Sequence, residues 1–280
     1  MSQQPESGKS KFARTKPQHR FLDECGDTTF FGKGKVPVIG KPGVSLSFSI
    51  GMVKFNTDLP PLRTKIRELE AAVVSDPLYN TLPSVRKKVG SGGFFFHATD
   101  DAPEVRAEFF RWIRTVPCSF EIVVARKISG IFARKHGSKE AEFYADILSH
   151  LIKNKLKLGE KLVLNIAERG RCTRNHNLQS ALTKATERFL KKQEVADVAS
   201  EVVFNVQTPR REPLLSVADY FCWAVQRVFE RGETRFYDYL GEQIRLVLDL
   251  YDDRKYAGSR NYYKKGNRLN STNKIGPPTL

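Results

Sequence analysis

Three carboxylates near the start of the chain are the residues best suited to chemistry. Asp23, Glu24 and Asp27 follow the apolar pair Phe21-Leu22 in the segment FLDECGD. Carboxylates crowded at the end of a strand repel one another, and a bound cation commonly offsets their charge. Their hard oxygen atoms favour Mg²⁺ or Mn²⁺. The ordinary alternative is a polar exit from a strand, in which Asp27 caps the turn.

Strand geometry divides these three acids. Alternation along a strand places Asp23 on the opposite face from Glu24, so the two need not share one ion. Gly26 permits the sharp turn that can bring Asp27 round toward them.

Two further acids lie later in the chain. Glu168 ends the stretch KLVLNIAE and is expected to emerge at the edge of a sheet, where open α/β sheets tend to place their sites. Asp219 lies in a helical pattern, across from the apolar stripe and beside Cys222 and Trp223, on a face that could line a cleft. Taken alone, the ordinary explanation for each is an exposed surface carboxylate, with Glu168 paired to a nearby arginine.

A histidine forms the last candidate. His97 closes the aromatic segment GFFFHA and is followed by Asp100 and Asp101. It could act as an acid or base, position a water, or simply satisfy a backbone carbonyl. The chain has no GxSxG or HExxH motif, which disfavours acyl transfer and zinc proteolysis. It also has no GxGxxG or GxxxxGK[ST] motif, which disfavours nucleotide-cofactor and NTPase functions.

The elements that must position these residues follow from hydrophobic periodicity. We predict strands at 19–25, 44–55, 93–98, 118–127, 161–168 and 200–208. We predict helices at 60–75, 99–116, 138–156, 175–194, 213–231 and 233–250. In the second of these helices, Thr99, Asp100 or Asp101 is expected to be the N-cap. The later strands show little alternation, which indicates a sheet covered on both faces, so the expected fold class is α/β with an open, mixed sheet flanked by helices.

The predicted organisation is one domain at 19–253 between two tails. The N-terminal tail (1–18) is polar and basic, and the C-terminal tail (254–280) is basic and rich in tyrosine. Neither is expected to support a core. In the C-terminal tail, tyrosines alternate with Lys and Arg, which suits base stacking beside phosphate neutralisation, although a purely solubilising tail is the alternative. These tyrosines are Tyr256, Tyr262 and Tyr263.

Composition narrows the partners. Lys and Arg number 47 against 31 Asp and Glu, and the net charge of +16 attracts polyanions. Nucleic acid, DNA or RNA, is the expected partner, although many basic proteins bind none. No apolar stretch has the length of a membrane span or a secretory signal, so no membrane partner and a cytoplasmic location are expected. Protein partners and oligomeric state stay open.

The spacing of the cysteines suggests neither a zinc-binding motif nor a disulfide framework. They are widely spaced and form no CxxC pair, so we expect reduced thiols. The four are Cys25, Cys118, Cys172 and Cys222.

These segments together resemble a known family. FLDECGD resembles the Y-I-D-E-S-G-D-type opening of the RNase H-like family catalogued as domain of unknown function 3800, and LLSVADYFCWAVQRVFE resembles its late helix, L-Q-x-A-D-x-x-A. A strand followed by a histidine (FFFHATDDAPEVR) and a strand ending in an acid (LVLNIAERG) fit the family's order. The resemblance spans about residues 19–250, with Cys25 where the family usually has serine and Glu168 where it often has aspartate.

The resemblance implies an RNase H-like fold and a nuclease that uses two Mg²⁺ or Mn²⁺ ions. It implies catalytic roles for Asp23, Glu168 and Asp219, with His97 added as a catalytic candidate. The implied metal ligands are Asp23, Glu168 and Asp219, with Glu24 and Asp27 as second-rank candidates.

Three functions are compatible with these observations. The first is a metal-dependent nuclease that hydrolyses phosphodiester bonds of DNA or RNA. The second is a catalytically weak or inactive nucleic-acid-binding or assembly component of a defence or mobile-element system. The third is phosphoryl chemistry on a small nucleotide, which a cleft too closed for a polymer would favour.

Overall fold

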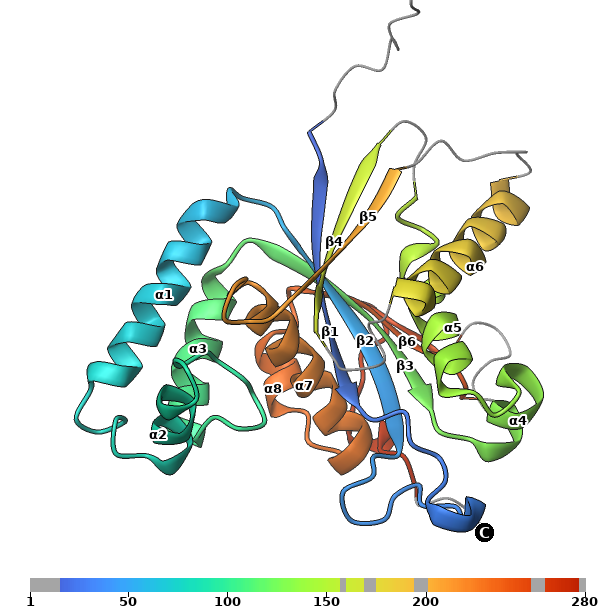
Figure 1. Cartoon of the computed structure of the whole chain (residues 1–280), viewed down its shortest axis with the longest axis horizontal. Helices are drawn as coiled ribbons and strands as arrows, with labels where there is room; N and C mark the ends of the chain where they lie inside the picture. The colour runs from blue at the N-terminus through green and yellow to red at the C-terminus, as the bar shows by residue number, and fades with distance from the viewer. Residues whose placement is uncertain (1–15, 157–159, 169–174, 194–200, 253–259, 277–280) are drawn as a thin grey trace, which may run out of the picture.

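A mixed β-sheet forms the centre of the molecule. The computed structural model describes residues 16–156, 160–168, 175–193, 201–252 and 260–276, and seven strands within them form one sheet. In spatial order the strands are β5 (Glu201–Gln207), β4 (Lys161–Ala167), β1 (Gln18–Gly26), β2 (Ser47–Phe55), β3 (Cys118–Arg126), β6 (Ile244–Asp249) and β7 (Tyr262–Tyr263). Strand β1 runs antiparallel to β2 and parallel to β4, and β3 runs parallel to β6 (Figure 1). The predicted α/β class is therefore confirmed, and the mixed, helix-flanked sheet is consistent with an RNase H-like fold.

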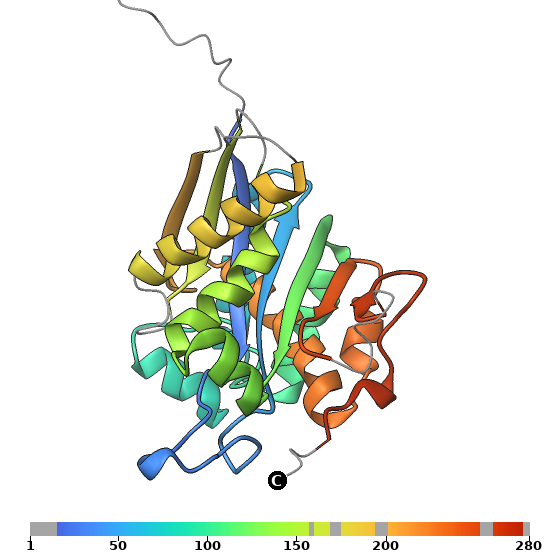
Figure 2. The ribbon, with the colours of Figure 1, turned by 90° about the vertical axis from the view of Figure 1, so that its right-hand side faces the viewer.

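Helices cover both faces of this sheet, as the unbroken apolar strands predict. We call one side the α7 face: α7 (Leu215–Arg231) packs against β1 and β2, and further helices lie outside it (Figure 1). These outer helices are α1 (Leu59–Ser75), α2 (Pro83–Gly90), α3 (Pro103–Thr115) and α8 (Arg235–Tyr239). The other side, the α5 face, carries α4 (Ser129–His136), α5 (Glu140–Ile152) and α6 (Asn175–Gln193) (Figure 2).

Side-chain alternation assigns residues of the opening strand to the two cores. Phe21 and Cys25 belong to the core under α7, whereas Leu22 belongs to the core under α5. Asp23 therefore faces α7 and Glu24 faces away from it, so the predicted division of these two acids is confirmed.

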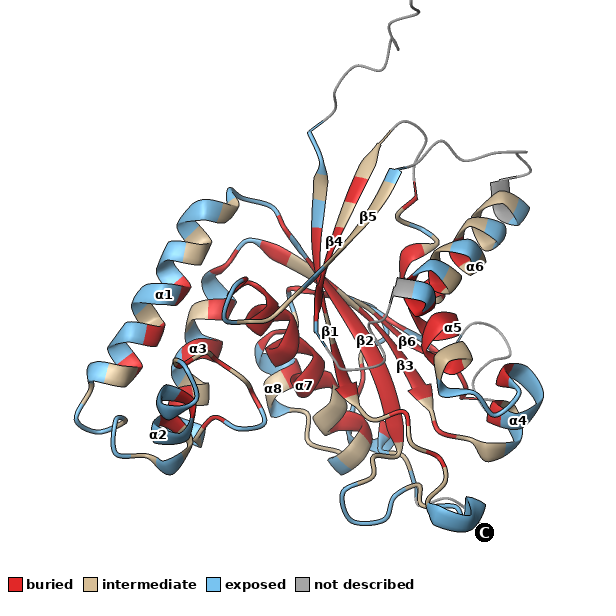
Figure 3. Ribbon diagram, in the orientation of Figure 1, coloured by how far each residue is buried: buried red, intermediate tan, exposed pale blue. Residues whose placement is uncertain are grey.

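From Leu215 to Val225, helix α7 is buried around its whole circumference, and only its C-terminal turns are partly exposed (Figure 3). Its apolar stripe packs on the sheet, and its mixed face is covered by the chain segments around α2 and α3. A helix enclosed in this way is a rigid support, so Asp219 on its mixed face is held within the protein and not on an open surface.

The aromatic segment before α3 is not a strand, and the prediction at 93–98 is wrong. Its carbonyl groups bond side chains instead of a neighbouring strand: Lys88 donates to Phe95 O at 3.0 Å, and Ser216 donates to Phe96 O at 2.7 Å. The predicted capping of the next helix is also wrong. The N-cap of α3 is Ala102, with no side-chain cap.

The predicted helix at 233–250 is replaced by the short helix α8 and strand β6. Leu248 packs in the core on the α5 face, and Val247 packs in the core under α7. Because β6 pairs with β3 in the sheet, tertiary pairing has overridden the local helical pattern.

The described part of the predicted C-terminal tail belongs to the fold. Tyr262–Tyr263 pairs with β6 as strand β7, and Tyr263 and Leu269 are buried in the core. The expectation that residues 254–280 support no core is therefore wrong for 260–276, where aromatic and amide side chains replace the missing aliphatic ones. Tyr256 lies outside the described residues, as do residues 1–15 of the predicted N-terminal tail.

Two predictions about composition can be compared with the described residues. Cys25, Cys118 and Cys222 are free and buried, while Cys172 lies outside the residues described. No helix in the described ranges combines the length and apolar character needed to cross a membrane.

Candidate active site

Asp23 lies in the middle of β1, directly beneath α7. The two elements are joined by reciprocal thiol contacts: Cys222 Sγ donates to the carbonyl of Asp23, and Cys25 Sγ donates to the carbonyl of Cys222, each at 3.3 Å. The neighbouring strand makes room for this contact, because residue 51, which pairs with Asp23, is glycine. A Cβ at Gly51 would lie 2.5 Å from Cys222 Sγ.

Asp219 lies one helical turn before Cys222 on α7. It is buried, and its Oδ2 accepts a hydrogen bond from the backbone N–H of Ala98 at 2.6 Å. Burial raises the pKa of Asp219 because the carboxylate is removed from water, and His97 acts in the opposite direction. A buried carboxylate of this kind favours a nearby positive charge.

Asp23 and Asp219 both act on the thiol of Cys222. Burial raises the pKa of this thiol well above the ordinary value, and the charges of Asp23 and Asp219 raise it further. Both carboxylates therefore lie within electrostatic range of one side chain. The strand that carries Asp23 and the helix that carries Asp219 are therefore in contact at Cys222.

His97 belongs to a loop that lies against Asp219 and is held by several hydrogen bonds. Asp101 is buried and accepts hydrogen bonds from the backbone N–H of His97 at 2.8 Å, from Lys88 at 2.5 Å and from Tyr220 at 2.6 Å. The side chain of His97 itself is 38% exposed, and its Nδ1 lies 3.2 Å from Oδ2 of Asp100. The loop is thus fixed against α7 while the imidazole stays accessible to water.

Glu168 lies apart from the two aspartates. Its N–H donates to Gln207 O at 2.9 Å, which continues the pairing of β4 with β5. Ala167 belongs to the core under α7, and Ile166 belongs to the core on the α5 face. By alternation, the exposed Glu168 belongs to the α5 face, so the expected convergence of Glu168 with Asp23 is not found.

The remaining predicted ligands serve other positions. Glu24 is buried on the α5 face. Asp27 accepts four hydrogen bonds: Oδ1 from Thr29 N and Lys127 Nζ, and Oδ2 from the N–H and hydroxyl of Ser45, all within 2.7–2.9 Å. These donors occupy its lone pairs, so Asp27 secures the turn and is not available as a ligand.

The same hydrogen bonds set the charge state of Asp27. Burial acts to raise its pKa, but the bonds from Lys127 and Ser45 outweigh burial and hold the pKa below its ordinary value. The sharp turn expected at Gly26 is confirmed by its φ of +80°.

Toward the C-terminal end of α7, positively charged side chains line a cleft, which we call the arginine cleft. The side chain of Trp223 contacts two guanidinium groups, Arg106 at 4.5 Å and Arg227 at 5.0 Å from the ring centroid. Together with Arg231 and Gln226 these residues line a cleft of about 460 Å³. Asp219 was expected to face a cleft beside Trp223; Trp223 lines this cleft, whereas Asp219 is buried and does not.

Hydrogen bonds connect the arginine cleft to the loop that carries His97. Arg106 donates to Ala98 O at 2.7 Å and to Asp101 O at 2.6 Å. Sequence reasoning missed Arg106 and the buried pair of Lys88 and Asp101. The arginine on α7 had a usable signal, since Asp219, Trp223 and Arg227 recur every four residues and so share one side of the helix.

Within the described ranges, no group of three or more His, Cys, Asp or Glu side chains is arranged to hold a metal ion. The arrangement instead offers two carboxylates, one accessible imidazole and an adjacent cationic cleft. Comparison with known proteins assigns no family: no protein-family model matches the chain, and no curated protein gives a significant match.

Proposed function

We propose that the chain is a divalent-metal-dependent nuclease that hydrolyses phosphodiester bonds of DNA or RNA in the cytoplasm. The observation that carries the proposal is that the strand of Asp23 contacts the helix of Asp219 at Cys222, while Ala98, next to the exposed His97, bonds the carboxylate of Asp219. The resemblance of the opening strand and late helix to the RNase H-like family named above is part of the same proposal.

The two carboxylates would hold a single hard cation. Mg²⁺ commonly keeps several waters and binds one or two carboxylates together with substrate phosphates, so Asp23 and Asp219 suffice as protein ligands. The bound ion would polarise the phosphoryl oxygen and lower the pKa of a water molecule. Asp219 would also be stabilised as the carboxylate, because the cation would offset the cost of its burial.

His97 would handle the proton of the attacking water. Nδ1 of His97 is buried and lies 3.2 Å from the carboxylate of Asp100 without a hydrogen bond, so Nε2 is the nitrogen that would accept the proton. The hydrogen bonds of Asp101 hold the backbone that carries the imidazole in place without substrate.

The arginine cleft supports a polymeric substrate over a small nucleotide. Twelve residues separate Asp219 from Arg231 on α7, which corresponds to a length of about 18 Å along a helix. This is longer than a single phosphate group requires. Guanidinium groups match phosphate geometry, so Arg106, Arg227 and Arg231 would hold the backbone next to the cleaved bond.

A second candidate function is nucleic-acid binding without turnover, within a defence or mobile-element assembly. It is favoured by the place of Glu168 on the α5 face, because the two-ion mechanism implied by the family resemblance needs a further carboxylate beside Asp23.

Cleavage assays with isosteric variants decide between the two functions. Labelled single- and double-stranded DNA and RNA are incubated with the protein in Mg²⁺, Mn²⁺ or a chelator. We expect cutting that requires metal and falls at least about 100-fold in Asp23→Asn and in Asp219→Asn, because each removes a charged ligand.

Asp58→Asn is the matched control, since Asp58 is exposed at the start of α1, and its activity should equal that of the wild type. Tight binding by the wild type with no cutting in either metal would contradict the nuclease proposal and favour the binding component. Equal cutting by Asp23→Asn and the wild type would contradict the proposed site.

A further inference from the structure

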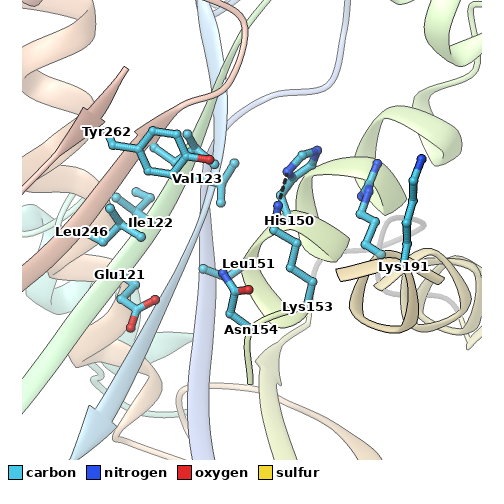
Figure 4. A pocket seen from close by; sticks show the side chains of 12 residues that line it. Glu121, Ile122, Val123, His150, Leu151, Lys153, Asn154, Lys191, Leu246 and Tyr262 are labelled. Carbon is cyan, nitrogen blue, oxygen red and sulfur yellow. Dashed lines mark hydrogen bonds between the residues drawn. The ribbon is translucent and has the colours of Figure 1, made fainter. Parts of the chain in front are cut away.

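The α5 face carries a second groove, remote from the candidate active site. It has a volume of about 570 Å³ and lies between the strands β3, β6 and β7 and the helices α5 and α6 (Figure 4). Ligand sites for small molecules commonly occupy about 300–1,000 Å³. Because Val123 and Leu248 in its floor belong to the core on the α5 face, the sheet separates this groove from Asp23 and Asp219.

One wall of the groove is aromatic. Tyr262 lies at the strand side of the groove in Figure 4, and 38% of its surface is exposed. Its neighbour Tyr263 is buried, where its hydroxyl accepts a hydrogen bond from Asn273 at 2.6 Å. Strand alternation in β7 therefore gives the two tyrosines different tasks: Tyr263 holds the sheet edge, and Tyr262 offers a ring beside an aliphatic floor.

The facing wall is cationic. Lys153, after α5, and Lys191, on α6, lie on the side opposite Tyr262 in Figure 4, and Arg188 on α6 also lines the groove. Glu121 also lines the groove, but its carboxylate is bonded to Lys155 at 2.6 Å. Arg188 is paired with the buried Asp146, whereas Lys191 is exposed. The groove thus keeps a positive charge for an anionic ligand.

We propose that this groove binds a nucleotide, with the base against Tyr262 and the aliphatic floor and the phosphate against Lys153 and Lys191. An aromatic ring facing ammonium groups across an apolar floor matches a ligand with a flat ring at one end and an anionic group at the other. Base stacking on an exposed aromatic side chain beside a basic wall is the physical basis of sequence-tolerant single-strand binding. The site goes beyond the proposed nuclease and needs no cleavage.

Binding measured in chelator tests the groove without interference from cutting. A fluorescein-labelled oligothymidylate of 20 nucleotides is titrated with the full-length chain, and the fluorescence anisotropy of the label is followed. We expect Tyr262→Ala to weaken binding about 10-fold, because one stacked base is lost. Tyr262→Phe keeps the ring and should bind within about twofold of the wild type. Lys191→Glu should weaken binding about 10-fold or more and reduce its salt dependence.

The chain offers matched controls. Tyr239 is as exposed as Tyr262 but lies on α8, and Lys265 is fully solvated on a loop, so Tyr239→Ala and Lys265→Glu should bind like the wild type. Because Tyr262 and Lys191 are exposed, their variants should keep wild-type circular dichroism. Ultraviolet crosslinking of a 4-thiothymidine oligomer should label the peptide that contains Tyr262.

Competition with adenosine monophosphate identifies the source of the nucleotide. Displacement of the oligomer at equal phosphate concentration indicates a free nucleotide, and displacement only by longer strands indicates a nucleic-acid strand; either result supports the site. Folded Tyr262→Ala and Lys191→Glu variants that bind as the wild type does would overturn it. The nuclease proposal fails separately, because Asp23→Asn tests cutting and leaves this groove intact.

Discussion

At the scale of single residues, the α5 face contains a buried group of charges around Asp146. This carboxylate accepts hydrogen bonds from Tyr251 at 2.6 Å and Lys135 at 2.8 Å and is also paired with Arg188. His150 lies beside it, with Nε2 at 3.8 Å from Oδ1 of Asp146. Burial lowers the pKa of His150 from 6.5 to about 3, and the positive charge of Arg188 adds to the effect.

This shift predicts acid sensitivity of the fold. Between pH 6.5 and about 3 the unfolded chain binds a proton at His150 that the folded chain does not, so the free energy of unfolding falls as the pH falls through this range. The expected slope is about 1.4 kcal/mol per pH unit. In His150→Gln, urea unfolding between pH 6.5 and 4.5 should show a shallower pH dependence.

The matched control is His176→Gln, because His176 is exposed on α6 and should leave the slope unchanged. An identical slope in the wild type and His150→Gln would contradict the assignment.

The limits of residue-level prediction are clear at Glu168. Residue type and local pattern only made Asp23 and Asp219 candidates, and the family resemblance selected them. The face of Glu168 depends on the register between β4 and β1, which are far apart in sequence, with Leu22 beside Ile166. A shift of this register by one residue would reverse the face, and local periodicity carries no information about it.

At the scale of elements, the close approach of α7 to the sheet positions the candidate site. A Cβ at Gly51 would lie 2.5 Å from Cys222 Sγ and 2.5 Å from the ring of Phe120. Gly51→Ala should therefore displace α7, with an expected loss of about 1–3 kcal/mol in the free energy of unfolding. The cleavage rate should fall by more than the loss of folded protein alone would cause, because Asp23 and Asp219 would move apart.

Gly130→Ala is the control, since no atom lies within 4 Å of its added Cβ, and it should unfold much like the wild type. Adding Cys222→Ala to Gly51→Ala removes one clash and should restore part of the stability. Wild-type stability in Gly51→Ala alone would show that the helix does not depend on this contact.

Elements were predictable where one period dominated. The alternation in β2 and the apolar stripe of α1 gave both elements nearly at their observed bounds. The aromatic segment at 93–98 was misread because strand composition does not reveal the partner of the backbone, which here is Lys88 and Ser216. Strand β6 was missed for a similar reason, since its partner β3 lies more than a hundred residues earlier.

At the scale of the whole molecule, the C-terminal segment completes the sheet and the core under α7. Leu269 is 3% exposed, whereas Leu78 on the surface is 68% exposed. Leu269→Ala should lower the free energy of unfolding by about 2–5 kcal/mol, because it leaves a cavity in that core. Leu78→Ala should be close to neutral. A neutral Leu269→Ala would restore the original prediction of a tail.

The overall charge of +16 predicts salt-dependent binding of nucleic acid, and under the proposed function the arginine cleft supplies part of it. Arg231→Gln should weaken binding to single strands and reduce the slope of log affinity against log salt by about 0.7, the value for one phosphate contact. Arg86→Gln, on the exposed surface of α2, is the control and should leave the slope unchanged. Equal slopes in both variants would remove Arg231 from the interface.

The two thiol contacts between β1 and α7 also allow local opening of the structure to be measured on the native cysteine. Cys222 is fully enclosed, and its thiol stays protonated, so a maleimide can reach it only when the helix lifts from the strand. The rate at which the peptide containing Cys222 is alkylated would therefore measure how often α7 separates from β1, with no engineered probe. Slower alkylation in the presence of Mn²⁺ and an oligonucleotide would show that ligand keeps the helix on the strand.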